Sequence, residues 1–439
     1  MHRKRNKSLG LKELVAIALG GMVGGGIFTI LGVSVSMIKN LTPVAIFLGG
    51  MIALLAAYSY VKLGVYYKDE GATYAFIKRT YPGSHFAPAM IGWFVVFGYI
   101  STLALYAYTF ASYSISGTAF AHDIWVRKIV SIGIISVFTA VNVWSVNGMG
   151  KIEDLMVYTK LLILFVISIV LIKVGAPNMQ DFLTSFGGEI KTISFISVLI
   201  VSSITFVAYE GFQLVINATN EMKNIEKNIP HAIYTAIFLA VLIYLVISFG
   251  ALLAIPAQDI IQNKEFALAA GAGKALGSIG SSLVILGAVL ATSSAISGTL
   301  FGSSRQMAAI SEDRYLPTFL SKRKMNIPIS AIITMAVISS LLILVGGLEL
   351  ILEFGSVTFL LVSLLMAIAN FKMRKKTNSS PLITLLAIGA LSLGGILILY
   401  YEFTHALHQM RFIIAMYIVL TIGAYVFSRR KNMSQPEAK

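Results

Sequence analysis

Five glycines in seven positions, at 20–26, form the most unusual cluster of the sequence. They lie in an apolar run, where each glycine costs about 1 kcal/mol of helix propensity relative to alanine. An unwound turn there would free amide N–H groups at the start of a half-helix, where the helix dipole favours a carboxylate. A packing seam is the alternative, since Gly20 and Gly24 have the GxxxG spacing. Gly24, Gly25 and Gly26 together put small residues on every helix face, which favours a broken, solute-binding helix. A dinucleotide fingerprint is excluded because no strand precedes the run.

Glu210 is an ionisable residue deep in the apolar run 193–218, next to Gly211. Insertion of a charge at such a depth costs about 2.5–3.5 kcal/mol, so a functional role is the first hypothesis. The alternative is a protonated or hydrogen-bonded carboxyl group that fixes helix packing. Phe206 and Tyr209 flank Glu210, where they either cover a ligand or belong to the core.

Lys160 lies about two turns inside the expected helix 154–174. At roughly 10 Å from the start of that helix, its long side chain could still reach the membrane interface. The functional alternative is a buried amine that binds and releases a proton near neutral pH. The spacing alone leaves both interpretations open.

Hydroxyl and imidazole groups give weaker signals. Ser293 and Ser294 follow Thr292 in an apolar run, where hydroxyls usually bond back to the preceding helical turn. His405 and His408 have helical spacing but fall in an expected loop, and the sequence holds no HExxH motif. The chain has no cysteine, which excludes disulfides and thiolate ligands. We therefore expect no metal site and no cofactor.

Membrane-spanning helices must position these residues. Hydrophobic residues make up 57% of the 439 residues and charged residues only 12%, about half the usual 25% of soluble proteins. The apolar runs have the length of about 20 residues that a spanning helix needs, and only helices satisfy their own backbone groups in lipid. The twelve expected spans are 11–37, 42–66, 86–118, 127–146, 154–174, 193–218, 230–254, 279–308, 328–347, 350–371, 381–400 and 410–428.

Basic residues set the expected orientation of these spans. If the N-terminus is cytoplasmic, the inner segments receive 24 Lys and Arg residues and the outer segments 8, with Lys62 and Lys160 inside helices. The positive-inside rule then predicts a multi-pass protein of the cytoplasmic membrane with both termini in the cytoplasm. The net charge of +15 thus reflects topology and contact with the lipid bilayer, not nucleic-acid binding. The sequence does not indicate an oligomeric state.

Two interrupted helices indicate an internal inverted repeat. The glycine run interrupts the first span, and Ala208 to Gly211 interrupts the sixth, so the breaks occupy corresponding helices of two five-helix halves. An odd number of helices in each half makes the second half inverted. The expected organisation is a cytoplasmic tail at 1–10, five-helix repeats at 11–175 and 190–372, two further helices in 380–428, and a cytoplasmic tail at 429–439.

In this order and spacing, the motifs resemble those of the amino acid–polyamine–organocation transporter superfamily over nearly the whole chain. The resemblance is carried by Gly24-Gly25-Gly26-Ile27-Phe28, Tyr209-Glu210-Gly211-Phe212, Asn220-Glu221-Met222-Lys223-Asn224 with Asn228-Ile229-Pro230, and Ser304-Arg305 with Asp313-Arg314-Tyr315-Leu316-Pro317. Ile225 stands where a proline is common, and Arg314 where glycine is usual. The resemblance implies an all-α membrane fold of about 12 helices, with a five-plus-five inverted repeat, broken helices 1 and 6, and alternating access.

The resemblance also implies how an amino acid would be held. Its carboxylate would face the amides of Gly25 and Gly26, and its ammonium would meet freed carbonyls near Met22 and at 206–207. The expected substrate-binding residues, all at the two breaks, are Met22, Gly24, Gly25, Gly26, Phe206, Val207, Tyr209 and Glu210.

Lys160 resembles the lysine of proton-coupled members, whose amine fills the site that sodium fills in sodium-coupled relatives. Ser293 and Ser294 are its expected neighbours. These features predict a secondary transporter of amino acids that works by proton symport, with Lys160 as the proton-carrying group. The alternative is an exchanger of amino acids or amines in which Lys160 only locks helix packing. An intramembrane enzyme would need a histidine or carboxylate cluster at the membrane face, and we expect no enzyme because the sequence offers no convincing one.

Overall fold

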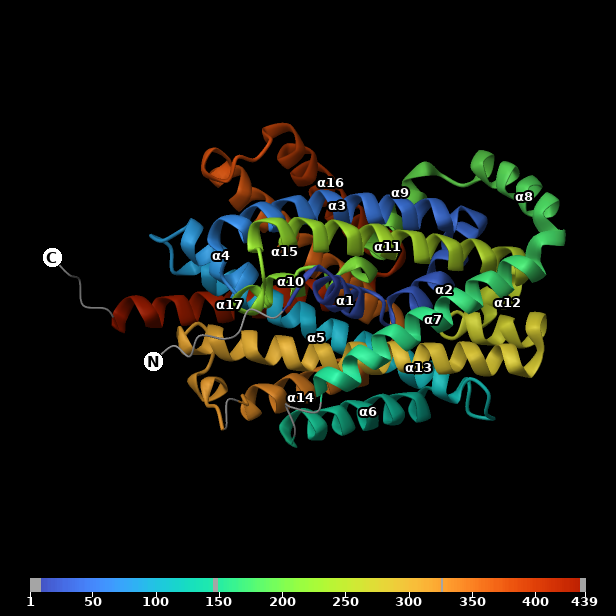
Figure 1. Cartoon of the computed structure of the whole chain (residues 1–439), viewed down its shortest axis with the longest axis horizontal. Helices are drawn as coiled ribbons and strands as arrows, with labels where there is room; N and C mark the ends of the chain where they lie inside the picture. The colour runs from blue at the N-terminus through green and yellow to red at the C-terminus, as the bar shows by residue number, and fades with distance from the viewer. Residues whose placement is uncertain (1–8, 145–148, 325–326, 435–439) are drawn as a thin grey trace.

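The computed structural model describes residues 9–144, 149–324 and 327–434, and these are almost entirely helical (Figure 1). No β-strand occurs among them, only two isolated bridges. The α-helices are α1 Leu11–Met22, α2 Gly26–Ile38, α3 Thr42–Tyr67, α4 Ala72–Thr80, α5 Phe86–Ile115, α6 Ile124–Trp144, α7 Met149–Gly175, α8 Met179–Thr192, α9 Phe195–Thr205, α10 Leu214–Asn217, α11 Ile225–Ala254, α12 Ala257–Gln262, α13 Ala267–Glu312, α14 Ile329–Val345, α15 Leu348–Thr377, α16 Pro381–His405 and α17 Leu407–Ser434.

Every predicted span has a helical counterpart, which confirms the all-α membrane class. Ten stretches of the described residues are long and apolar enough to cross a membrane. The number is smaller than twelve for two reasons: α2 and α3 form one continuous stretch, Gly26–Tyr67, and α14 is a shorter apolar helix of 17 residues. Gly277, with a φ of 73°, divides α13, so that its spanning part begins at that glycine, two residues before the predicted start at 279.

Three short helices lie between the spans and were not predicted: α4, α8 and α12. Each is shorter than a membrane span, and α8 alternates apolar and polar residues along 179–192. Such segments give no long apolar run, so hydropathy alone assigns them to loops. His405 ends α16 and His408 lies in the first turn of α17, so the predicted outer loop is reduced to a sharp corner at Ala406.

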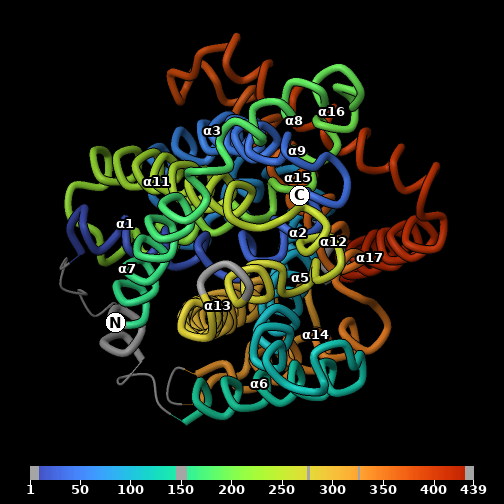
Figure 2. The backbone as a smooth tube through the Cα atoms, turned by 90° about the vertical axis from the view of Figure 1, so that its right-hand side faces the viewer, coloured from blue at the N-terminus to red at the C-terminus, as the bar shows by residue number. Residues whose placement is uncertain are grey.

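The long helices run roughly along the longest axis of the molecule (Figure 1). We call its two ends the α4 end, on the left in Figure 1, and the α12 end, on the right. Seen along this axis, α2 and α5 lie in the middle and α6, α14, α16 and α17 at the rim (Figure 2). In the most apolar window of α5, 83% of residues are buried, against 17% in that of α17.

Large apolar side chains cover the outside of the bundle. Trp144 is 89% exposed and Ile279 is 83% exposed, and many further examples lie on α16 and α17. Water would penalise such a surface, whereas lipid accepts it, and the helices satisfy their backbone hydrogen bonds internally. The exterior therefore fits a bilayer, and the polar side chains that do chemistry are found inside.

Candidate functional site

The first helix is broken at the glycine run. α1 ends at Met22 and α2 begins at Gly26. In between, the Gly24 amide donates to the carbonyl of Met22 at 2.9 Å instead of continuing the helical pattern. In a continuous helix the Gly24 amide would donate to the carbonyl of Gly20. Because it does not, the last carbonyls of α1 have no backbone donor within the helix.

Three side chains from three other helices bind these freed carbonyls. Each is buried and donates to one of three successive oxygens: Lys160 Nζ on α7 to Gly20 O at 3.0 Å, Tyr106 Oη on α5 to Gly21 O at 3.0 Å, and Tyr244 Oη on α11 to Met22 O at 2.7 Å. The C-terminus of a helix carries partial negative charge, which favours a cation beside it. The amine of Lys160 therefore lies where the end of α1 attracts it.

Lys160 points into the bundle and not toward the membrane interface. Its side chain is 0% exposed. A lysine that reached along its stem to the interface would keep its amine in contact with water, so this geometry disfavours the interfacial alternative.

The start of α2 offers amides and no side chains. Gly25 is the N-cap of α2 and Gly26 its first residue, so their N–H groups fall in the turn that lacks helical acceptors. The same glycines are also tightly packed: a Cβ on Gly26 would lie 2.9 Å from Ala208 Cα, and one on Gly24 would lie 2.7 Å from Ala295 Cβ. The run is therefore both a helix break and a packing seam.

The sixth helix breaks against the first. α9 ends at Thr205, a 3-10 turn follows over Phe206–Tyr209, and the chain resumes as the short α10. Gly211 has a φ of +127°, and a Cβ there would lie 2.5 Å from the carbonyl carbon of Gly21. Only glycine suits this position, both for its backbone conformation and for its contact with α1. Tyr244 Oη also reaches Ala208 O at 2.9 Å, so one hydroxyl ties the two breaks together.

Glu210 lies in this second break and is 3% exposed. Its Oε2 accepts a hydrogen bond from Gln213 Nε2 at 2.6 Å, and Gln213 in turn contacts Tyr99 Oη at 3.3 Å. The Oε1 atom is buried and has no hydrogen-bond partner within the described residues. Glu210 therefore lies at the second break with one carboxyl oxygen still able to accept a hydrogen bond.

The hydroxyl cluster of α13 approaches the first break. Thr292 bonds back to Ala288 O at 2.7 Å, as the local pattern indicated. Ser293 and Ser294 are buried, and Ser294 Oγ has no hydrogen-bond partner in the part of the chain that the structure describes. Ala295, the next residue, lies against Gly24. The two serines thus sit within one or two residues of the contact between α13 and the break.

Several predicted residues already have partners. Met22 O accepts from both Gly24 N and Tyr244 Oη, and Val207 O accepts from Glu210 N at 3.2 Å. Tyr209 donates to Ile46 O at 2.7 Å, and Phe206 is 0% exposed. The structure therefore brings all eight expected substrate residues to the two breaks, where the carbonyls of Met22 and Val207 already accept hydrogen bonds.

Tyr106 and Tyr244 were not among the residues predicted for the site. Tyrosines within long apolar runs have no distinguishing pattern, and Tyr244 lies 222 residues from Met22. A count of the carbonyls that a broken α1 must leave unpaired would have predicted that donors exist, though not which residues supply them.

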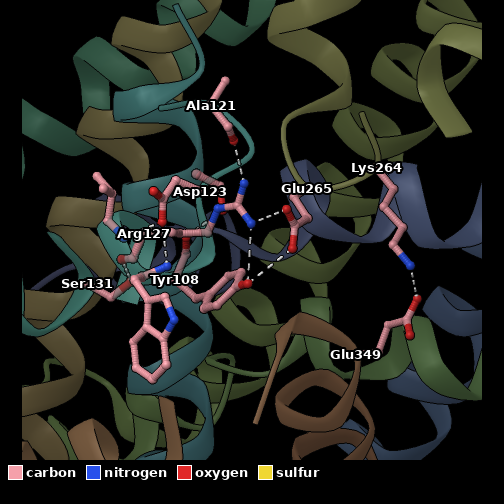
Figure 3. A network of polar contacts seen from close by, with 11 residues as sticks. Tyr108, Ala121, Asp123, Arg127, Ser131, Lys264, Glu265 and Glu349 are labelled. Atoms are coloured by element: carbon pink, nitrogen blue, oxygen red, sulfur yellow. Dashed lines mark hydrogen bonds and ion pairs between the residues drawn. The ribbon is translucent and has the colours of Figure 1, made fainter. Parts of the chain in front are cut away.

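Two ion pairs on neighbouring residues join helices at the α12 end (Figure 3). Glu265 pairs with Arg127 of α6, whose side chain is 1% exposed and also donates to Ala121 O at 2.6 Å. Lys264 pairs with Glu349 of α15. The carbonyl of Lys264 packs against Gly32 of α2 so closely that a Cβ there would clash. The connection between α12 and α13 is therefore fastened over α2.

The α4 end is closed as well. Leu9, just before α1, exchanges backbone hydrogen bonds of 3.0 Å with Glu221 and Lys223, beyond the second break. Tyr74 and Lys78 of α4 both donate to Asp313 at 2.6 Å. The substrate residues predicted at the breaks are all buried, so the structure is occluded on both sides.

A bundle of membrane-spanning helices around two facing helix breaks, closed at both ends, is the architecture of a multi-pass transport protein. The family comparison gives the same class: residues 9–428 match the model of the amino acid permease family. The chain therefore belongs to that family, which implies an amino acid as substrate and a membrane setting.

The chain is similar to three relatives along most of their length. It is 28% identical over 98% of both chains to the inner membrane transport protein YbaT of Escherichia coli. It is 27% identical to an uncharacterised protein of Methanocaldococcus jannaschii, over 96% of this chain and 95% of that one. It is 25% identical to the serine/threonine exchanger SteT of Bacillus subtilis, over 72% of each.

The structure also shows what one departure from the family pattern costs. Arg314, where glycine is usual, has a φ of 64°. That left-handed conformation costs a side chain roughly 1–2 kcal/mol and is nearly free for glycine. Arg314 lies in the loop after α13 and outside the two breaks.

Proposed function

We propose that the protein carries amino acids across the cytoplasmic membrane together with protons, and that Lys160 is the proton-carrying group. The observation that carries this proposal is the fully buried amine of Lys160 on the carbonyl of Gly20, in the last turn of α1. A buried amine can lose its charge, because burial penalises the charged form. Its charge also determines how strongly it binds the negative end of α1.

The proton would act on the position of α1. When Lys160 is charged, its hydrogen bond to Gly20 holds α1 against α7. Lys160 would take up its proton from the α12 side, and the protonated carrier would then open toward the α4 end. Loss of the proton at the α4 end would weaken the attraction to the helix dipole and reset the carrier. Ser293 and Ser294, near the contact of α13 with the first break, are the proposed polar neighbours of this step.

The substrate would lie between the two breaks. We place its carboxylate at the amides of Gly25 and Gly26, where the start of α2 favours negative charge, with Gly24 allowing the chain to pass close to Ala295 beside them. Its ammonium would meet carbonyls of Met22 and of residues 206–207. Since Met22 O already holds two donors, we expect the ammonium to displace one of them. Glu210 Oε1 offers the ammonium a further hydrogen-bond acceptor. Tyr209 would line the binding site.

The orientation follows the distribution of basic residues. We infer that the α4 end faces the cytoplasm, with both termini on that side, and that 11–175 and 190–372 are inverted five-helix repeats followed by two helices in 380–428. Of the two proposed tails, residues 1–8 and 435–439 lie outside the described residues, whereas residues 429–434 continue α17 as a helix.

An exchanger without net proton coupling is the second candidate. The relative named as a serine/threonine exchanger supports it. In that case the hydrogen bond of Lys160 to Gly20 would only fix packing. An enzymatic role is a weaker proposal, since the family and its named relatives are transporters.

Purified protein in proteoliposomes separates the two candidates. Symport predicts that a pH gradient, acidic outside, drives accumulation of a labelled amino acid into vesicles that contain none. Exchange predicts uptake only when the vesicles are preloaded, whatever the gradient. A thermal-shift screen against the common amino acids chooses the substrate beforehand, because a ligand of the folded state raises the melting temperature by mass action.

A further inference from the structure

Two buried carboxyl groups face each other far from Lys160. Glu353 lies in the second turn of α15 and Glu402 near the last turn of α16, both toward the α12 end of the bundle. Glu353 is 4% exposed and Glu402 is 0% exposed. The two side chains interact directly, carboxyl to carboxyl, where α15 packs against α16.

If both groups are ionised, the pair has hydrogen-bond acceptors but no donor. A carboxylate only accepts hydrogen bonds. Glu353 Oε2 and both oxygens of Glu402 are buried and have no donor within the described residues. Adjacent carboxylates in an apolar site cannot both hold a negative charge, and one proton shared between them removes a charge and supplies a donor. The unpartnered oxygens therefore point to a proton as the missing ligand.

The groups around the pair are few. The charged and titratable side chains that act on it are Glu349, one turn earlier on α15, Lys264 from the connection between α12 and α13, and Tyr401 beside Glu402. Lys264 is already ion-paired with Glu349 (Figure 3). One positive charge thus faces three carboxyl groups, which leaves the pair with an excess of negative charge unless it holds a proton.

A groove opens beside this region. It has a volume of about 770 Å³ and lies between the ends of α2, α9 and α16, lined by Ser36, Ser194, Tyr401 and His405 together with apolar side chains such as Ile396. Tyr401 belongs to the lining and also interacts with both carboxyl groups. The groove at the α12 end therefore comes within one side chain of the pair.

We propose that Glu353 and Glu402 form a proton-binding site that holds one shared proton, is reached from the α12 end and is separate from Lys160. The proton joins the two carboxyl groups and no other bond changes. This site does not rest on the coupling role of Lys160, since its evidence is a different set of atoms in another part of the bundle.

Infrared spectroscopy of the purified full-length protein at neutral pH tests this proposal without any transport assay. A protonated carboxylic acid has a C=O stretch that a carboxylate lacks. Wild-type protein is expected to show this band, and Glu353→Gln and Glu402→Gln are each expected to lose one carboxylic-acid equivalent per chain. The amide of the introduced glutamine donates a hydrogen bond to the remaining carboxylate, which can then ionise.

Glu226→Gln is the matched control, because it removes an exposed carboxyl group that is ion-paired with Lys68 and is not among the groups that act on the pair, and it should leave the band unchanged. Glu210→Gln identifies any contribution from the other buried acid. Absence of a protonated-carboxyl band in wild-type protein overturns the proposal without any variant. An undiminished band in both Glu353→Gln and Glu402→Gln overturns it as well, and neither outcome depends on whether Lys160 couples protons.

Discussion

Tyr244→Phe is the most informative single change at the two breaks. Its hydroxyl lies 2.7 Å from Met22 O and 2.9 Å from Ala208 O, and a tyrosine hydroxyl has one hydrogen to share between them. Met22 O keeps a second donor, Gly24 N, whereas Ala208 O loses the donor that joins it to α11. The change therefore removes one shared hydrogen bond and leaves one buried carbonyl poorly satisfied.

The expected loss of stability follows from the lost hydrogen bond and the unsatisfied carbonyl. A buried hydrogen bond contributes about 0.5–1.5 kcal/mol net, and an unsatisfied buried acceptor costs about 1–3 kcal/mol. Because two oxygens shared one hydrogen, we expect a loss of about 2 kcal/mol in the free energy of unfolding. The unfolding entropy grows with chain length, by about 2.1 cal/mol/K per residue, so that for the 439 residues of this chain 1 kcal/mol shifts the melting temperature by roughly 1 °C. A fall of roughly 2 °C is therefore expected.

The assay is thermal unfolding of the purified variant in detergent, measured beside Tyr234→Phe. Tyr234 lies on the same helix, is half-buried and stands ten residues earlier, away from both breaks, so its change should leave the melting temperature within about 1 °C of wild type. Equal melting temperatures for Tyr244→Phe and wild type would refute the inference that this hydroxyl holds the breaks together.

Three further changes test other parts of the structure. Gly26→Ala should destabilise the protein by about 1–3 kcal/mol because its Cβ meets the second break, whereas Gly389→Ala, with open space around it, should be neutral or stabilising in thermal unfolding. Glu265→Gln leaves a buried guanidinium without its counter-charge; in this cysteine-free chain, Thr29→Cys should then react faster with a membrane-impermeant thiol reagent, and an unchanged rate would argue against a closure at the α12 end. Arg314→Gly should raise the unfolding free energy by about 1 kcal/mol, since it removes a side chain from a left-handed conformation; a lower melting temperature would contradict this.

The sequence predicted those parts of the site that consist of backbone. Five glycines in seven positions have few uses inside a membrane helix, and a break releases amides and carbonyls whatever the neighbouring residues are. Gly26 accordingly starts α2, within the predicted range. The length and polarity of the runs were enough for the helices, because lipid leaves the backbone no other solution.

The parts that depend on tertiary contacts could not be predicted. Tyr106 and Tyr244 become donors to α1 only because α5 and α11 pack around it, and each looks like any other tyrosine in an apolar run. Arg127 and Glu265 are far apart in the chain, so their ion pair has no local signature. Lys160 lies deeper in its helix than predicted, because α7 begins at Met149 and not at 154, and the choice between interface and interior required its contact with Gly20.

Uptake driven by a pH gradient in proteoliposomes, compared for wild type and Lys160→Ala, tests the central claim most directly. Wild type should accumulate the amino acid above equilibrium when the outside is acidic, because a membrane potential of 100 mV alone supplies about 2.3 kcal/mol for each coupled charge. Lys160→Ala should lose this accumulation and retain counterflow in preloaded vesicles, which shows that it is folded and binds substrate. Full gradient-driven accumulation by Lys160→Ala would contradict the assignment of Lys160 as the proton carrier.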